Sequence, residues 1–249
     1  MRDRPIVLTI DDNQSALGTL AVLLERMHLD VLPVTSPRDA IDLARVARPQ
    51  VIILNMQMAG LDCLAFMRTL RADEELADIP VIMVTAVREK QRVWEAMSLG
   101  CIEVLDLPLE LSRMHQALQR CNLYPERRRR YLRAPFAQKV ELELRGETLS
   151  LNAVTLSERG IMVRMETPLA KGTRVELRVA IPQGETLSLG GEVIYVRGGK
   201  GGNLALAAGV AIKFTRVTLK DTEKLHAFVK ELLIGDIVAN QTETIIRPD

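Results

Sequence analysis

The sequence predicts an α/β domain followed by an all-β domain, and the pattern changes near residue 122. Up to about residue 121, short apolar runs alternate with segments whose apolar residues recur at helical spacing, which is typical of a doubly wound parallel sheet. Beyond that point, short strand-like stretches are separated by glycine-rich turns, which is typical of a small antiparallel barrel. The charge balance changes at the same place, because residues 1–122 carry 13 Lys+Arg and 17 Asp+Glu, whereas the remainder carries 20 and 15. The second half therefore favours an anionic partner.

In the first half, five strands are each followed by a helix. The strands are expected at 6–10, 31–35, 51–54, 80–84 and 102–105, and the helices at 17–27, from 37 on, at 64–70, 93–97 and 109–121. Ligand sites in such sheets lie beyond the carboxyl ends of the strands. Four polar residues at three of these ends are therefore expected to converge in one crevice: Asp11, Asp12, Asn55 and Thr85.

In the second half, six strands and a closing helix are predicted. The strands are expected at 137–144, 147–155, 161–165, 174–181, 186–196 and 204–214, and the helix at 220–234. The glycine cluster at 198–202 lies between two of these strands, so a hairpin tip is favoured over a phosphate-binding loop. The tail after Asp236 is expected to be poorly ordered.

The composition narrows the class of protein. A chain of 249 residues that is 47% hydrophobic and 26% charged has the size of one large domain or two ordinary ones and is not disordered. No signal peptide and no membrane-spanning run is predicted. Cys63, Cys101 and Cys121 give neither a disulfide framework nor a metal-ligand pair, which favours a reducing cytoplasm. The sequence shows no arrangement for nucleophilic catalysis, so we expect a protein that is not an enzyme.

Several segments of the first half resemble the receiver domain of two-component response regulators, over about residues 4–121. Ile10-Asp11-Asp12 resembles the acidic pair that holds a divalent cation, and Val84-Thr85-Ala86 resembles the strand end whose hydroxyl contacts the phosphoryl group. The strand 51–55 ends where the family has its phosphoacceptor aspartate, and Leu105-Asp106-Leu107-Pro108 resembles the motif in which a lysine precedes the proline.

Three positions depart from that pattern, namely Asn55, Leu107 and Val104. The acceptor of the family is a carboxylate nucleophile, and a neutral amide cannot form the acyl phosphate. Leu107 removes the cation that pairs with the phosphoryl group, and Val104 stands at the aromatic switch position. We therefore expect a pseudoreceiver that contacts a protein partner, for instance by forming a homodimer through its fourth helix, fifth strand and fifth helix.

Two alternatives remain for the acidic pair. Hard cations require anionic oxygen ligands, and the amide at position 55 leaves one charge fewer than the family has. Asp11 and Asp12 are therefore expected to bind no metal, or Mg²⁺ only weakly. The alternative is a solvated acidic strand end without a ligand.

The second half resembles the PilZ domain, over about residues 124–235. A basic run contains Arg128-Arg129-x-x-x-Arg133, which is similar to the RxxxR motif that grips cyclic di-GMP in that family. Thr155-Leu156-Ser157-Glu158-Arg159-Gly160 is similar to the second motif, [D/N]xSxxG. Without the second motif, four consecutive arginines would indicate a solvated linker or a nonspecific polyanion patch.

The resemblance implies a binding site for cyclic di-GMP formed by Arg128, Arg129, Arg133, Thr155, Ser157 and Gly160. Guanidinium groups meet phosphate oxygens, or the O6 and N7 edge of guanine, with paired hydrogen bonds. Thr155 is the weak point, because its single hydroxyl cannot reproduce the bidentate bond of the family's Asp or Asn. Losing such a bond costs on the order of 1.5–3 kcal/mol, which is roughly 10- to 150-fold in affinity.

These observations predict residues 1–121 as a receiver-like domain, 122–127 as a linker, 128–235 as a PilZ domain and 236–249 as a C-terminal tail. The leading hypothesis is a non-enzymatic cytoplasmic effector of cyclic di-GMP, with a role in motility, adhesion or biofilm control. One alternative is an interaction scaffold that no longer binds the nucleotide. Another is a nucleic-acid-binding regulator that uses the arginine run, and a phosphorelay regulator is the least favoured.

Overall fold

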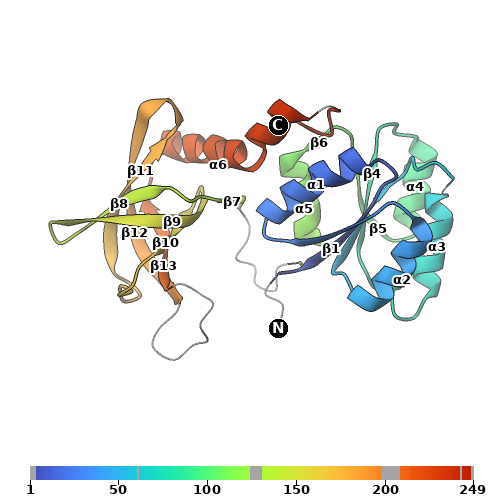
Figure 1. Ribbon diagram of the computed structural model, residues 1–249, viewed down its shortest axis with the longest axis horizontal. Helices are drawn as coiled ribbons and strands as arrows, with labels where there is room; N and C mark the ends of the chain where they lie inside the picture. The colour runs from blue at the N-terminus through green and yellow to red at the C-terminus, as the bar shows by residue number, and fades with distance from the viewer. Residues whose placement is uncertain (1–3, 61, 124–130, 198–207, 242, 248–249) are drawn as a thin grey trace. The chain divides into compact units, whose positions relative to one another are not determined.

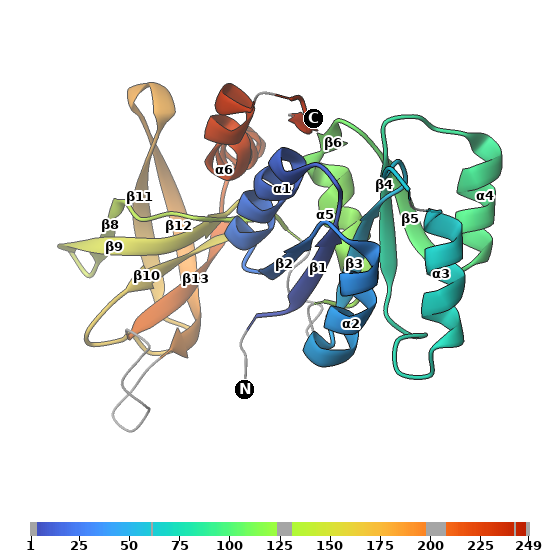
Figure 2. The ribbon, with the colours of Figure 1, turned by 45° about the vertical axis from the view of Figure 1, so that its right-hand side comes forward.

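The computed structural model describes residues 4–60, 62–123, 131–197, 208–241 and 243–247, and its chain forms two compact units (Figures 1 and 2). The first unit comprises residues 1–130 together with 234–249, and the second comprises residues 131–233. The division falls inside the last helix, so the C-terminal segment belongs to the same unit as the N-terminus. Among the described residues, no helix is long and apolar enough to cross a membrane.

The first unit contains the predicted parallel sheet in the order β2-β1-β3-β4-β5. Figure 2 shows α1 and α5 on one face of the sheet and α2, α3 and α4 on the other. The strands are β1 (Ile6–Ile10), β2 (Asp30–Val34), β3 (Val51–Asn55), β4 (Val81–Thr85) and β5 (Cys101–Asp106). The helices are α1 (Gln14–Arg26), α2 (Pro37–Ala47), α3 (Cys63–Ala72), α4 (Lys90–Ser98) and α5 (Leu111–Arg120).

The second unit is an antiparallel barrel followed by a helix. Its strand order is β10-β13-β12-β11-β8-β9-β7, and an additional pairing of β10 with β9 closes it. The six predicted strands are confirmed as elements, and the short β7 (Arg133–Pro135) pairs with β9 as a further strand. The last predicted strand, at 204–214, is described only from residue 208 and begins at Gly209, and the predicted hairpin tip at 198–202 lies outside the described residues. The others are β8 (Lys139–Leu144), β9 (Glu147–Ser157), β10 (Gly160–Arg164), β11 (Arg174–Ile181), β12 (Glu185–Arg197) and β13 (Gly209–Arg216).

The barrel core follows from the period-two pattern of its strands. In β11, Val175, Leu177 and Val179 are buried, and the residues between them are exposed. Helix α6 (Leu219–Asn240) follows the barrel, and Phe228 on this helix meets Phe136 edge to face, with the ring centroids 5.6 Å apart. The period of the sequence therefore decides which side chains fill the barrel.

The C-terminal tail is where the prediction was wrong. Instead of becoming disordered after Asp236, the chain continues as α6 to Asn240 and then forms β14 (Ile246–Arg247). Strand β14 pairs in parallel with β6 (Leu109–Glu110), and Ile246 is completely buried. The predicted start of the fifth helix at 109 was wrong for the same reason, because residues 109 and 110 pair with the tail and α5 begins at Leu111. A two-residue strand has no periodicity that a sequence pattern reveals.

Candidate functional site

The carboxyl ends of β1, β3 and β4 bring the predicted polar residues of the first unit together. Asn55 donates from Nδ2 to Oδ2 of Asp11 at 3.0 Å, and its Oδ1 accepts the backbone N–H of Gln57 at 2.9 Å. Thr85 ends β4 and is 1% exposed. The structure thus brings Asp11 and Asn55 into direct contact and places Thr85 at the end of the neighbouring strand β4.

Gln57 connects Asn55 with Thr85, although no sequence pattern indicated this role. Its Nε2 donates to Oγ1 of Thr85 at 2.8 Å and to the carbonyl of Val87 at 3.2 Å, while its Oε1 accepts the N–H of Ala86 at 2.7 Å. The Gln57 amide thus forms hydrogen bonds with both the Thr85 hydroxyl and the Ala86 N–H at the end of β4. The only signal in the sequence is a second amide two residues after Asn55.

The acidic pair is engaged by donors of the protein itself. Asp11 accepts the N–H of Asn13 at 2.9 Å in addition to the Asn55 amide, and Asp12 accepts the N–H of Ala59 at 2.7 Å. Burial raises the pKa of Asp11, which is 8% exposed. Asp11 is therefore not part of a solvated strand end, although Asp12 is exposed.

The donor set disfavours a magnesium ion, because position 55 supplies a neutral amide in place of a third carboxylate. Three of the four oxygens of the acidic pair already accept N–H groups, and the Asn55 oxygen that would replace the third ligand accepts the N–H of Gln57. Over the described parts of the chain, no group of three or more His, Cys, Asp and Glu side chains is placed to hold a metal ion.

The other two departures lie on and just beyond β5. Val104 is buried in the strand, at 2% exposure. Leu107 follows the strand and lines a small cavity of about 20 Å³ together with Asp11 and Val84. Ile245, from the C-terminal segment, lines the same cavity. An apolar side chain at 107 therefore has an apolar neighbour from the tail.

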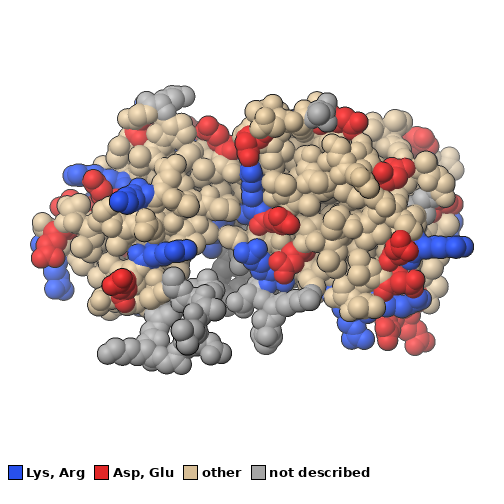
Figure 3. Space-filling model, in the orientation of Figure 1, with Lys and Arg blue, Asp and Glu red and all other residues tan. Residues whose placement is uncertain are grey.

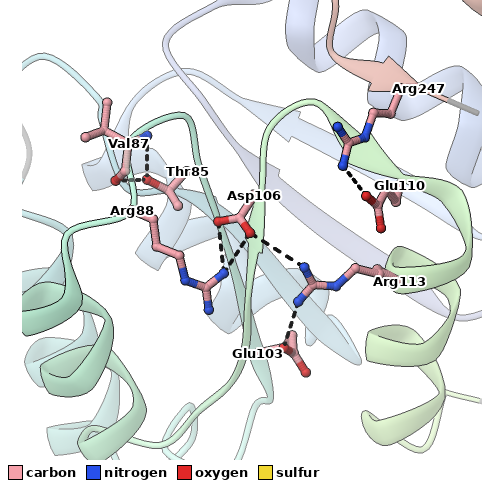
Figure 4. Close-up of polar contacts among 8 residues, drawn as sticks. All are labelled: Thr85, Val87, Arg88, Glu103, Asp106, Glu110, Arg113 and Arg247. Carbon is pink, nitrogen blue, oxygen red and sulfur yellow. Dashed lines mark hydrogen bonds and ion pairs between the residues drawn. The ribbon is translucent and has the colours of Figure 1, made fainter. Parts of the chain in front are cut away.

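A chain of ion pairs covers the surface formed by α4, β5 and α5 (Figure 4). Arg88 meets both carboxylate oxygens of Asp106, at 2.9 and 2.8 Å, and Arg113 lies 3.6 Å from both Asp106 and Glu103. Arg120 also pairs with Glu103. Most of these side chains are 40% exposed or more, so each pair contributes at most about 1 kcal/mol. Large apolar side chains are exposed on and just before α4: Val87, Trp94 and Met97.

In the second unit, strand register places part of the predicted nucleotide site on one surface. Arg133 on β7 pairs with Ser157 on β9, and Ser157 also pairs with Gly160 on β10. Thr155 lies two residues before Ser157 and therefore on the same face of β9. Residues directly opposite in antiparallel strands share a face. Arg133, Thr155, Ser157 and Gly160 therefore cluster, whereas Arg128 and Arg129 lie outside the described residues.

Ser157 and Gly160 also have structural tasks that the sequence did not reveal. The Ser157 hydroxyl donates to the Gly160 carbonyl at 3.0 Å and accepts the N–H of Arg159 at 3.4 Å, which holds the turn between β9 and β10. A Cβ atom on Gly160 would lie 2.5 Å from the carbonyl oxygen of Ile212 on β13. The glycine is thus required for the close approach of two strands.

Two further side chains border this cluster. The Arg159 guanidinium lies over the Tyr131 ring, 5.3 Å from its centroid, and Tyr131 is 42% exposed. Glu158 approaches Nδ1 of His226 on α6 at 2.7 Å. Arg159 stands inside the second motif, and Tyr131 stands between the motif arginines 129 and 133. Their positions in the motifs are the signal that was missed.

Two known domain families match the chain. Residues 7–119 match the response regulator receiver domain, and residues 127–231 match the PilZ domain. The chain is a receiver domain fused to a PilZ domain.

Individual relatives match the receiver part of the chain or a longer stretch that includes more than its 113 matched residues. The cyclic di-GMP phosphodiesterase response regulator RpfG of Xanthomonas campestris pv. campestris is 28% identical over 155 residues, which cover 61% of this chain and 36% of that protein. The polar-differentiation response regulator DivK of Brucella ovis is 28% identical over 113 residues, which cover 45% of this chain and 92% of that protein. This chain thus spans about a third of the length of RpfG.

Solved structures of response regulators match about half of the chain. Chemotaxis response regulator CheY4 of Vibrio cholerae is 24% identical and covers 47% of this chain and 98% of its own, with a TM-score of 0.44. A response regulator receiver protein from Pseudomonas putida is 24% identical and covers 48% and 98%, with a TM-score of 0.45.

Proposed function

We propose that this protein is a non-enzymatic effector that binds cyclic di-GMP on its PilZ domain. The observation that carries the proposal is the strand register that places Arg133 beside Ser157 and Gly160. All three positions match the motifs of a family that commonly binds this nucleotide. RpfG is a cyclic di-GMP phosphodiesterase response regulator, which supports the proposal by analogy only.

The chemistry of the proposed site is that of a cationic and aromatic surface. Arg133 is exposed on β7, and its guanidinium group suits a phosphate or the O6 and N7 edge of guanine. The exposed ring of Tyr131, with Arg159 against it, adds a surface on which a purine base can stack. Arg128 and Arg129 are the motif residues expected to close over the ligand. Thr155 offers no bidentate partner, which favours a dissociation constant in the micromolar range.

We also propose that the receiver domain is not phosphorylated. Asn55 is neutral, the Gln57 amide holds the Thr85 hydroxyl and the Ala86 N–H, and Leu107 supplies no cation. Acetyl phosphate and beryllium fluoride with Mg²⁺ are therefore expected to leave the amide spectrum of the receiver unchanged. A shift of the Thr85 and Ala86 amide resonances would instead support the phosphorelay alternative.

The role proposed for this domain is a protein contact. Its α4–β5–α5 surface combines the ion pairs shown in Figure 4 with the exposed side chains of Trp94 and Met97, which suits either a partner protein or a second copy. Cys63, Cys101 and Cys121 are free and buried, in keeping with the predicted cytoplasmic location. Burial raises the pKa of Cys101 to about 11 and that of Cys121 to about 12, so neither is poised to react.

Isothermal titration with cyclic di-GMP tests the nucleotide proposal. The full chain is expected to bind with a Kd of about 1–10 µM, and Arg129→Ala and Arg133→Ala are each expected to weaken binding at least about tenfold. Arg174→Ala is the matched control, because Arg174 is exposed on β11, which is separated from β9 by β8. Equal loss in Arg174→Ala would mean nonspecific attraction to a cationic barrel. Absence of heat with the unmodified chain would favour the interaction scaffold.

The nucleic-acid alternative has less support. On the face shown in Figure 3, acidic residues are interspersed with basic ones on both units. A nucleic-acid surface needs a continuous basic patch, and its affinity falls steeply with added salt. Tight binding of duplex DNA or single-stranded RNA that weakens in this way would favour that alternative over the proposed effector.

A further inference from the structure

The C-terminal segment makes polar contacts at several separate points of the receiver domain. Asp236, in the last part of α6, forms two hydrogen bonds with Arg26 of α1, at 2.5 and 2.6 Å. Glu243 accepts from Nδ2 of Asn13, the residue that caps the start of α1, at 2.6 Å. The contact with Arg26 lowers the pKa of Asp236 to about 2, so this carboxylate is ionised at neutral pH.

The last described residues of the segment add a strand to the receiver. The N–H of Leu109 donates to the carbonyl of Ile245 at 2.7 Å, and Ile246 and Arg247 lie in parallel register with Leu109 and Glu110. Arg247 also forms an ion pair with Glu110 (Figure 4). Main-chain pairing of an extended segment with an exposed strand edge is a recurring mode of peptide recognition.

Apolar contacts continue this docking toward the acceptor pocket. Ile246 and Leu109 are 0% and 1% exposed. Ile245 lines the small cavity that Leu107, Val84 and Asp11 also line. Asp11 in turn bonds to Asn55, so the segment reaches residues in direct contact with the former acceptor position. Leucine in place of lysine at 107 thus has a positive consequence, because it gives this cavity an apolar wall.

The segment also carries its own support. The side chain of Gln241 donates from Nε2 to the carbonyl of Ile246 at 2.7 Å, and its Oε1 accepts the N–H groups of Ile245 and Ile246 at 3.0 and 3.2 Å. These bonds shape the turn from within the segment. A segment that is shaped in this way resembles a ligand with a partly formed bound conformation, which lowers the ordering cost of docking.

The contacts are few enough for docking to be reversible. The strand pairing covers two residues, and the ion pairs to Arg26 and Glu110 are partly solvated, with Asp236 59% and Arg247 50% exposed. Exposed ion pairs hold weakly. The buried Ile246 is therefore the dominant anchor, and its loss is expected to release the segment.

We propose that β6 and the cavity beside Leu107 form a peptide-docking site whose occupant is the chain's own segment 241–247, and that occupancy of this site, in place of phosphoryl transfer, sets the state of the receiver. The second half of this inference rests on the proposed loss of phosphorylation. The docking site itself does not, and its test uses neither phosphate nor nucleotide. Loss of docking and phosphorylation of the receiver would therefore be detected by different experiments.

Hydrogen exchange in the full chain tests docking. Ile246→Asp places a charge in the buried anchor, and the Leu109 amide is expected to exchange at least about tenfold faster than in the unmodified chain. Thr244→Asp is the matched control, since it adds the same charge two residues away at an exposed position and is expected to leave the Leu109 rate unchanged. Equal Leu109 rates in all three chains would overturn the proposal.

A labelled synthetic peptide with the sequence of residues 236–249 tests whether the site accepts a ligand. It is expected to bind the Ile246→Asp chain at least about tenfold more tightly than the Thr244→Asp chain, because only the first has an open site and a tethered occupant competes at high effective concentration. Equal binding to both chains, or to neither, would contradict a docking site.

A charge reversal covers the case in which Ile246→Asp does not fold. Arg247→Glu is expected to speed exchange at Leu109 by repelling Glu110, and Glu110→Arg combined with Arg247→Glu is expected to restore protection. Exchange that stays fast in the double variant would show that this pairing does not hold the segment, and would count against the proposal.

Discussion

Asp11 holds a charge in surroundings that disfavour it. Its pKa is raised above the ordinary value, chiefly by burial, so the folded protein favours the neutral acid more than the unfolded chain does. The group therefore contributes stability below the unfolded pKa of about 3.9 and loses it as pH rises through the folded value. Asp11→Asn removes this pH dependence, so its Tm relative to that of the unmodified chain is expected to be higher at pH 7 than at pH 3, measured by calorimetry.

Asp12→Asn is the control for that measurement. Asp12 is exposed and accepts the N–H of Ala59, so its replacement is expected to give no gain in Tm at either pH. An equal gain at pH 3 and pH 7 for Asp11→Asn would show that packing, and not the buried charge, explains the effect.

Thr155 carries a residue-scale prediction in the PilZ domain. It is 8% exposed and stands where the family has Asp or Asn. Thr155→Asn restores an amide that forms two hydrogen bonds with a guanine edge, and is expected to tighten cyclic di-GMP binding about tenfold or more in calorimetry. Thr155→Val, which is nearly isosteric, measures what the present hydroxyl contributes. An unchanged Kd in Thr155→Asn would place the nucleotide away from this strand.

At the scale of elements, Gly160 separates a structural role from a ligand-binding one. Its missing Cβ allows β10 to approach the Ile212 carbonyl of β13, so Gly160→Ala is expected to destabilise the barrel by about 1–3 kcal/mol in urea unfolding. Gly18→Ala is a control of opposite sign, because space around this position in α1 is open and alanine favours a helix by about 1 kcal/mol. An unchanged free energy of unfolding in Gly160→Ala would mean that contact with the ligand, and not strand packing, requires glycine at this position.

Sequence pattern predicted the elements that have strong periodicity. The five-stranded sheet and the six main barrel strands follow from apolar runs and alternation, and the contact between Asp11 and Asn55 follows from where parallel strands end. The short pairing of β6 with β14 was missed, since it joins residues 137 apart and is only two residues long. Gln57 was missed because its contacts with Thr85 arise only when two loops meet in space.

For the whole molecule, α6 is a physical link between the two domains. It begins in the PilZ unit, and its last residues belong to the receiver unit, directly before the docked segment. If cyclic di-GMP shifts α6, it is expected to change hydrogen exchange at Leu109. Coupling is reciprocal, so Ile246→Asp is then expected to change the Kd for the nucleotide by the same factor. Binding that leaves Leu109 exchange unchanged, with equal Kd values, would show that the two sites are independent.

The return of the C-terminus to β6 also changes what counts as a domain boundary in this chain. The receiver is discontinuous, because its final strand is encoded more than a hundred residues after its fifth helix. A fragment that stops at residue 123 would therefore lack β14, leave the N–H of Leu109 unpaired and expose apolar surface beside Leu107. A search for binding partners with such a fragment would detect proteins that bind the exposed edge of β6, which β14 covers in the intact chain. Conversely, a tag fused directly after Arg247 would adjoin β14 and is expected to weaken its pairing with β6.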